Sequence, residues 1–134
     1  MTKGYLLDTN ICIYLFKGKY NIREKLIEVG LKHCFISEIT LAELIYGAQC
    51  SNNVKKHTKE IEDLVSILQV LPIRPILPVY GRVKKELRLM GMLIENFDLL
   101  IGVTALANNL VMVTENIKHV GHIPELEIEN WVER

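Results

Sequence analysis

The sequence predicts an α/β fold in which helices cover both faces of a parallel sheet. Short apolar runs suited to buried strands alternate with longer segments of helical periodicity. Strands that alternate with helices are joined by right-handed crossovers, which make the sheet parallel and place helices on both of its faces. The 134 residues are expected to form a single domain, 1–134, because a chain of this length can bury a core without cross-links.

The first half of the chain supplies two strands and several helices in this pattern. Residues 5–7 are expected to form a buried strand directly before a helix start, and residues 34–37, CFIS, a second strand. Helical periodicity then runs through 40–49. A long helix is expected over 53–69. Its apolar face is expected to consist of Ile61, Leu64, Val65 and Leu68.

The second half begins with three prolines and ends with a short alternating segment. Pro78 suits the first turn of a helix that runs towards residue 90. A further helix is expected over 97–107, with a stop at the two asparagines 108–109 and a strand over 110–113. The tail LEIENW alternates apolar and polar residues, which favours a final short strand.

Composition is that of an ordinary globular protein from a reducing compartment. Hydrophobic residues make up 49% and charged residues 24% of the chain, which excludes a disordered or collagen-like protein. Cys12, Cys34 and Cys50 are odd in number and form no C-x-x-C pair, so neither a disulfide framework nor a zinc finger is indicated. No apolar run suits a signal peptide or a membrane span, so we expect a soluble cytoplasmic protein.

The charges balance, with 16 Lys plus Arg and 16 Asp plus Glu. The whole molecule is therefore not drawn to nucleic acid, and such a role would depend on a local basic patch or a metal ion. The candidate cations are Lys17, Lys19 and Arg23 after the first helix, and Arg82, Lys84, Lys85 and Arg88 on the helix before Asp98.

Asp8, in the stretch YLLDTN, stands between the first strand and a helix start. One interpretation is helix capping, because the side-chain oxygens of Asp8, Thr9 and Asn10 can accept from the N–H groups of a first helical turn. The other is a binding site, because open parallel sheets bind ligands at the carboxyl ends of their strands. Position alone leaves both interpretations open.

Two further acids, Glu43 in TLAELIYG and Asp98 in NFDLLIG, also stand in mostly apolar surroundings. Thr40 and Glu43 match the capping box, in which the glutamate bonds a backbone N–H. Asp98 near a helix start would be favoured by the helix dipole. Taken together with Asp8, however, both acids can reach the carboxyl edge of the same parallel sheet.

Three carboxylates that converge at one edge would repel one another in a partly dry cleft. A divalent cation relieves that repulsion, and oxygen ligands suit a hard ion such as Mg²⁺ or Mn²⁺. Such an ion can polarise a phosphodiester and activate a water molecule for attack. The acids therefore indicate metal-dependent phosphodiester chemistry.

The segments LLDTN, TLAELIYG and NFDLLIGVTALANNLVMVTEN resemble, in their order and spacing, a PIN-domain ribonuclease of the VapC toxin family. The similarity runs over about 5–131. It implies a three-layer α/β/α domain with a parallel sheet of about five strands and a Mg²⁺-dependent endoribonuclease site, with Mn²⁺ as a substitute ion. By position, Asp8, Glu43 and Asp98 would hold the metal.

The resemblance also implies roles for two further residues and for partners. Thr114, at a strand end in VTEN, would orient metal-bound waters or a neighbouring carboxylate, and Asn10 is expected to hydrogen-bond within its own loop. The implied substrate is RNA, with tRNA among the classes considered. The implied partners are a VapB-type antitoxin whose tail blocks the acidic groove and a second copy of the toxin.

One departure from the family concerns the residues that follow Thr114. An acid followed by an aromatic residue is common there, whereas this chain has His119 and Val120. A neutral imidazole is a poor Mg²⁺ ligand beside carboxylates, so the use of one or two metal ions stays open. Glu95 and Glu115 are the alternatives for the missing acid, and His119 with His122 gives only a weak zinc signal.

Two other functions are weighed against the nuclease. Aspartyl-phosphate phosphatases carry D-x-D-x-T after a strand, but Asn10 stands where the second aspartate would be. A catalytically weak PIN-like module that only binds RNA or protein would be indicated by a broken acidic triad. All three acids are present here, which favours the nuclease.

Overall fold

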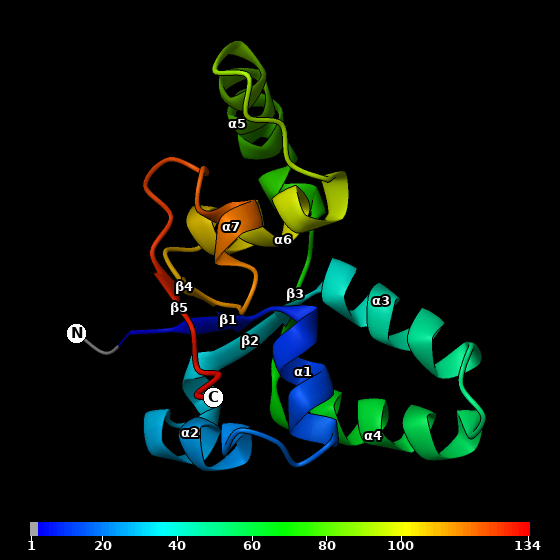
Figure 1. The fold of residues 1–134 in the computed structure, drawn as a ribbon. Coiled ribbons are helices and arrows are strands. Elements are labelled where there is room, and N and C mark those ends of the chain that lie inside the picture. Colours follow the sequence, from blue (N-terminus) through cyan, green and yellow to red (C-terminus); the bar gives the residue numbers. More distant parts are fainter. Residues whose placement is uncertain (1–2) are drawn as a thin grey trace.

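The computed structural model describes residues 3–134 and contains one five-stranded parallel sheet (Figure 1). The strand order is β3-β2-β1-β4-β5, and each neighbouring pair is parallel. The strands are β1 (Tyr5–Leu7), β2 (Cys34–Ser37), β3 (Gln69–Leu71), β4 (Val111–Val113) and β5 (Ile128–Glu129).

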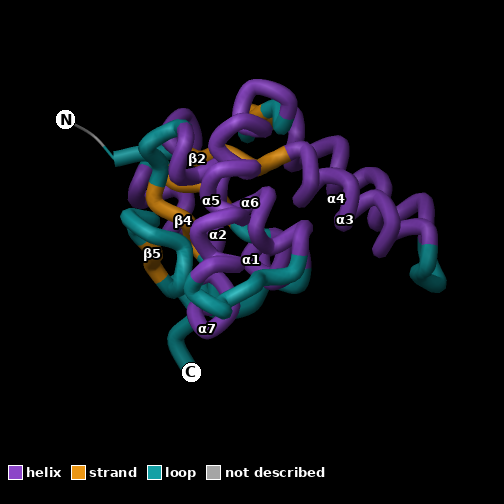
Figure 2. Tube along the Cα trace, turned by 90° about the horizontal axis from the view of Figure 1, so that it is seen from above, coloured by secondary structure: helices purple, strands orange, loops and turns teal. Residues whose placement is uncertain are grey.

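Helices cover both faces of the sheet, with α5, α6 and α7 on one side and α1, α2 and α4 on the other (Figure 1). Seen from above, α3 and α4 run side by side away from the sheet (Figure 2). The helices are α1 (Thr9–Phe16), α2 (Ile22–Val29), α3 (Glu38–Gln49), α4 (Val54–Ile67), α5 (Leu77–Leu89), α6 (Asn96–Ala107) and α7 (Ile117–Val120), with 3₁₀ turns at Leu31–His33 and Arg74–Ile76. The predicted three-layer α/β/α fold with about five parallel strands is confirmed.

Two apolar clusters, one on each face of the sheet, form the core. Successive side chains of a strand point to opposite faces, and β1 shows the consequence. Leu7 belongs to the cluster that includes Ile11 and Leu64, whereas Leu6 belongs to the cluster that includes Leu99. Both leucines are fully buried, as expected for β1, which is the central strand of the sheet.

The second half of the chain follows the sequence prediction closely. Pro78 lies in the first turn of α5, and α6 begins one residue before the predicted start. Asn109 has a left-handed backbone with φ 56°, which ends the helical run before β4. The predicted short strand in LEIENW is β5.

The predicted helix over 53–69 is too long, because α4 ends at Ile67. Gln69 begins β3 and is paired with Phe35 of β2. Val65 was also wrongly placed on the buried face, since it is 37% exposed whereas Leu64 is 2% exposed. The buried stripe of α4 is narrower than the hydrophobic pattern suggests, and Val65 lies at its edge.

The carboxyl ends of β1, β2 and β4 meet at one edge of the sheet, as parallel pairing requires. The residues that directly follow these strands are Asp8, Glu38 and Thr114. Within residues 3–134, no helix has the length and apolar character needed to cross a membrane.

Candidate metal centre

Asp8 is buried at the carboxyl end of β1, with 4% of its surface exposed. As the N-cap of α1, its Oδ1 accepts from the N–H of Thr9 at 2.8 Å. Its Oδ2 accepts from the hydroxyl of Thr114 at 2.7 Å. The capping interpretation is therefore right for one carboxylate oxygen, while the other oxygen is bound to the residue that follows β4.

The surroundings of Asp8 act on its pKa in both directions. Burial raises the pKa, and the charges of Asp98 and Glu43 raise it further, whereas the hydrogen bonds from Thr114 and Thr9 lower it. The net effect is a raised pKa. The two other predicted acids thus lie within electrostatic reach of Asp8, although they come from different helices.

Glu43 lies in the second turn of α3 and is not part of a capping box. The N-cap of this helix is Ser37, whose Oγ accepts from the N–H of Thr40 at 3.0 Å. The capping-box position is therefore Thr40, and that interpretation of Glu43 was wrong. Glu43 Oε1 instead accepts from the hydroxyl of Thr9 at 2.6 Å, which ties α3 to the start of α1.

Asp98 lies in the first turn of α6, which is compatible with the predicted helix-dipole interaction. Burial raises the pKa of Asp98, the charge of Glu95 raises it further, and His119 lowers it. His119 Nδ1 stands 3.8 Å from Asp98 Oδ2. The residue that replaces the usual family acid therefore faces one of the predicted metal ligands.

Thr114 and Asn10 link the start of α1 to the loop after β4. Thr114 orients a neighbouring carboxylate, that of Asp8, and its Oγ1 also accepts from the N–H of Asn116 at 2.9 Å. Asn10 Nδ2 donates to Thr114 Oγ1 at 3.4 Å, and its Oδ1 accepts from the N–H of Glu115 at 3.5 Å. Asn10 thus bonds the opposite loop rather than its own, which differs from the expectation.

Sequence reasoning missed the roles of Thr9 and Glu115. Thr9 was considered only as a cap, yet its hydroxyl holds Glu43. Glu115 accepts from Tyr14 Oη at 3.1 Å and from Arg134 Nη2 at 2.8 and 2.9 Å, so its carboxylate is already engaged. Glu95 caps α6 by accepting from the N–H of Asp98 at 3.2 Å. Both alternative acids therefore make contacts within the protein, Glu115 with Tyr14 and Arg134 and Glu95 with the first turn of α6.

The donor atoms at this edge fit a hydrated divalent cation. They are carboxylate and hydroxyl oxygens, which Mg²⁺ and Mn²⁺ prefer. Within residues 3–134, no three His, Cys, Asp or Glu side chains stand close enough to hold one ion directly. Because Mg²⁺ usually keeps several of its waters, carboxylates spaced more widely can hold it partly through water.

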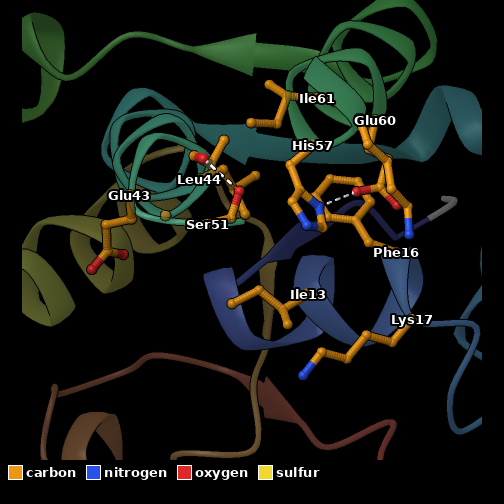
Figure 3. Close-up of a pocket in the computed structure, with 12 residues that line it drawn as sticks. Ile13, Phe16, Lys17, Glu43, Leu44, Ser51, His57, Glu60 and Ile61 are labelled. Atoms are coloured by element: carbon orange, nitrogen blue, oxygen red, sulfur yellow. Dashed lines mark hydrogen bonds and ion pairs between the residues drawn. The ribbon is translucent and has the colours of Figure 1, made fainter. Parts of the chain in front are cut away.

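An apolar cavity of about 450 Å³ adjoins Glu43 between α1, α3 and α4 (Figure 3). Its apolar lining residues include Ile13, Phe16 and Leu44. His57, on the α4 side, is hydrogen-bonded to Glu60 at 2.6 Å. The acidic edge therefore continues into a groove that has a predominantly apolar lining.

Comparison with known proteins decides the family. A PIN domain family model matches residues 5–120. Ribonuclease VapC2 of Rickettsia felis is 36% identical over 130 residues, which cover 95% of this chain and 97% of that protein. The chain belongs to the VapC ribonucleases of the PIN-domain family.

Two further similarities agree with this membership of the VapC group. The tRNA(fMet)-specific endonuclease VapC of Salmonella typhimurium is 35% identical over 129 residues, or 95% of this chain and 97% of that protein. The crystal structure of VapBC2 from Rickettsia felis bound to a DNA fragment from its promoter contains a chain with 37% identity and a TM-score of 0.86, matched over 95% of this chain and 98% of that one. The resemblance noted in the sequence is confirmed.

Proposed function

We propose that this VapC-type PIN domain is a Mg²⁺-dependent endoribonuclease and the toxin of a toxin–antitoxin pair. One observation carries the proposal: the charges of Glu43 and Asp98, on α3 and α6, act on the buried carboxylate of Asp8 after β1. Capping and dipole roles require no such convergence of like charges. Membership among the VapC ribonucleases supports the nuclease part of the proposal.

In this proposal Asp8, Glu43 and Asp98 hold Mg²⁺, for which Mn²⁺ can substitute. A bound ion of this kind polarises the scissile phosphodiester and lowers the pKa of a bound water. The threonines Thr114 and Thr9 keep the carboxylates of Asp8 and Glu43 oriented by donating to one oxygen of each. A carboxylate oxygen retains further lone pairs for a cation.

The proposal includes a VapB-type antitoxin and a toxin homodimer. The solved relative is a VapBC assembly. The groove beside Glu43 offers an apolar lining that can bury the side chains of an antitoxin segment, so that this segment covers the acidic edge (Figure 3). RNA is the proposed substrate, and the Salmonella relative makes tRNA the first class to test.

The experiment is incubation of the purified protein with total RNA and Mg²⁺, with and without EDTA, followed by mapping of the cut ends. If a metal-activated water attacks the scissile phosphate, the cut is expected to leave a 5′-phosphate. Asp8→Asn serves as the inactive control. Full cleavage that persists in EDTA would contradict the metal-dependent mechanism.

The alternative is a catalytically weak PIN-like module that only binds RNA or protein. It is favoured by one observation, namely that His119 faces Asp98 where the family commonly has an acid nearby. The same incubation separates the two functions. RNA that is bound but left uncut in both Mg²⁺ and Mn²⁺ would identify the binding module.

A further inference from the structure

Helix α5 carries a basic face around a glycine. Gly81, Lys84, Lys85 and Arg88 are neighbours on one side of the helix, because residues three and four apart share a face. A Cβ built at Gly81 would meet no atom within 4 Å. These four residues line an open cavity of about 270 Å³. We call them the α5 basic face.

The α5 basic face is joined to the helix that carries Asp98. Lys84 Nζ donates to Asn96 Oδ1 at 2.8 Å, and it lies 5.6 Å from the centre of the Tyr80 ring. Tyr80 Oη donates to the same Asn96 oxygen at 3.0 Å. Asn96 is the first residue of α6 and precedes Asp98 by two positions. The basic face thus lies beside the end of α6 that supplies the acid.

In the part of the chain that the structure describes, no acid forms a salt bridge with this face. Glu86 pairs with Arg82 at 3.9 Å, on another side of α5. Among the salt bridges of residues 3–134, none includes Lys84, Lys85 or Arg88. By contrast, the groove that contains Lys17 and Lys56 also contains Glu43 and Glu60.

We propose that the α5 basic face binds backbone phosphates of the RNA strand that is cut at the acidic edge. The inference rests on the proposed function and adds a phosphate-binding surface to it. A chain with zero net charge needs a local patch to attract a polyanion. The three cations of the α5 basic face meet that need, because no acid lines the same cavity. Gly81 has no side chain, which leaves room for a phosphate. Arg88 can bind a phosphate through two parallel hydrogen bonds.

The test compares two double variants with the same change in charge. Lys85→Gln with Arg88→Gln removes two cations of the α5 basic face. Lys32→Gln with Lys55→Gln is the matched control, since both lysines are exposed and Lys32 precedes β2, at the opposite edge of the sheet. Lys84 is left unchanged because it also contacts Asn96. Thermal melts of both double variants verify that they are folded.

The readout is binding of a fluorescein-labelled single-stranded RNA in EDTA over a series of salt concentrations. Each lost phosphate contact reduces the slope of log affinity against log salt by about 0.7 for a single strand. We expect a shallower slope and weaker binding for the α5 double variant only. The charge-conserving pair Lys85→Arg with Arg88→Lys should restore the wild-type slope.

Three results would overturn this inference. Equal slopes for the two double variants would exclude a phosphate site on α5, and so would a wild-type protein that binds no RNA. Loss of a copurifying antitoxin with an unchanged RNA slope would assign the face to an acidic protein partner instead. Failure of the proposed nuclease function would give a different result: the protein would bind RNA in EDTA but would not cut it in Mg²⁺.

Discussion

The carboxylate of Asp8 experiences opposing influences from its neighbours. Burial and the charges of Asp98 and Glu43 disfavour its ionised form, while Thr114 and Thr9 favour that form through hydrogen bonds. Because the first group of effects dominates, ionised Asp8 destabilises the fold when no cation is present. A bound cation would remove that destabilisation. Substitution of one of these acids is therefore expected to change stability in opposite directions with and without metal.

Thr114→Val tests the hydrogen bond to Asp8. Valine keeps the shape of threonine but leaves a buried carboxylate oxygen and the N–H of Asn116 without their partner. We expect a loss of about 1–3 kcal/mol in unfolding free energy and a further rise in the pKa of Asp8. Urea denaturation measures the first effect. Thr114→Ser keeps the hydroxyl and should lose much less, so equal stability of the two variants would contradict this role.

The sequence was sufficient to predict that Asp8, Glu43 and Asp98 lie near the carboxyl edge of the sheet, because the carboxyl ends of parallel strands meet at one edge. It could not find the bond from Thr9 to Glu43, since the two side chains are 34 positions apart and meet only through the packing of α1 against α3. The engagement of Glu115 by Arg134 was hidden for the same reason.

At the scale of the element, α3 is positioned by the cap at its start. Ser37→Ala removes the acceptor for the N–H of Thr40 and should lower the unfolding free energy by about 0.5–2 kcal/mol. Ser66→Ala is the control, because the Ser66 hydroxyl donates to the Asp63 carbonyl oxygen on the exposed surface of α4. Chemical denaturation compares them. A Ser37→Ala protein that is as stable as the control would show that α3 does not depend on this cap.

The elements that the sequence did not predict are those that depend most on their surroundings. Helix α7 has four residues, and α2 has eight residues and no side-chain cap at Asn21. Helices this short are stabilised mainly by packing, so their local sequence signal is weak. The boundary between α4 and β3 was missed because the fully buried Leu68 fits the end of a helix and the entry to a strand equally well.

At the scale of the whole molecule, we expect a homodimer that copurifies with an antitoxin. Large apolar side chains are exposed where α5 ends and in the segment after it. Leu89, the last residue of α5, is 73% exposed, and Leu93, between α5 and α6, is 63% exposed. Large exposed apolar side chains that are close together in the sequence make this region a candidate interaction site. Coexpression of the native operon followed by purification tests for a copurifying antitoxin, and light scattering measures whether the protein is a dimer. A monomer at high concentration with no copurifying protein would contradict the expectation.

The raised pKa values of Asp8 and Asp98 predict how stability responds to pH without metal. The folded state binds these protons at a higher pH than the unfolded state, so the contribution of both groups to stability increases as pH falls through the raised values. The contribution of Asp8 and Asp98 is complete only when the pH is below the pKa that these carboxyl groups have in the unfolded chain. We therefore expect any advantage of Asp8→Asn with Asp98→Asn over the wild type to shrink as pH falls in EDTA.

Chemical denaturation of both proteins over a series of pH values checks this difference. Ionisable groups far from Asp8 and Asp98 contribute equally to the two proteins and cancel in the comparison. Glu43, Glu95 and His119 interact with these two acids, so their interactions are part of the measured difference. An advantage of the double variant that grows towards acid pH would show that the carboxylates are stabilised, rather than destabilised, in the fold.

The most direct test of the metal centre is a set of thermal melts with and without Mg²⁺ for the wild type, Asp8→Asn and Asp98→Asn. Asp63→Asn is the control, since Asp63 is exposed and its one salt bridge within residues 3–134 is with Lys59. We predict that Mg²⁺ raises the Tm of the wild type and the control, while each site variant is at least as stable without metal and gains nothing from Mg²⁺. Site variants that melt lower than the wild type without metal and respond to Mg²⁺ as it does would contradict the account, leaving Asp8 as a helix cap and Asp98 as a dipole partner.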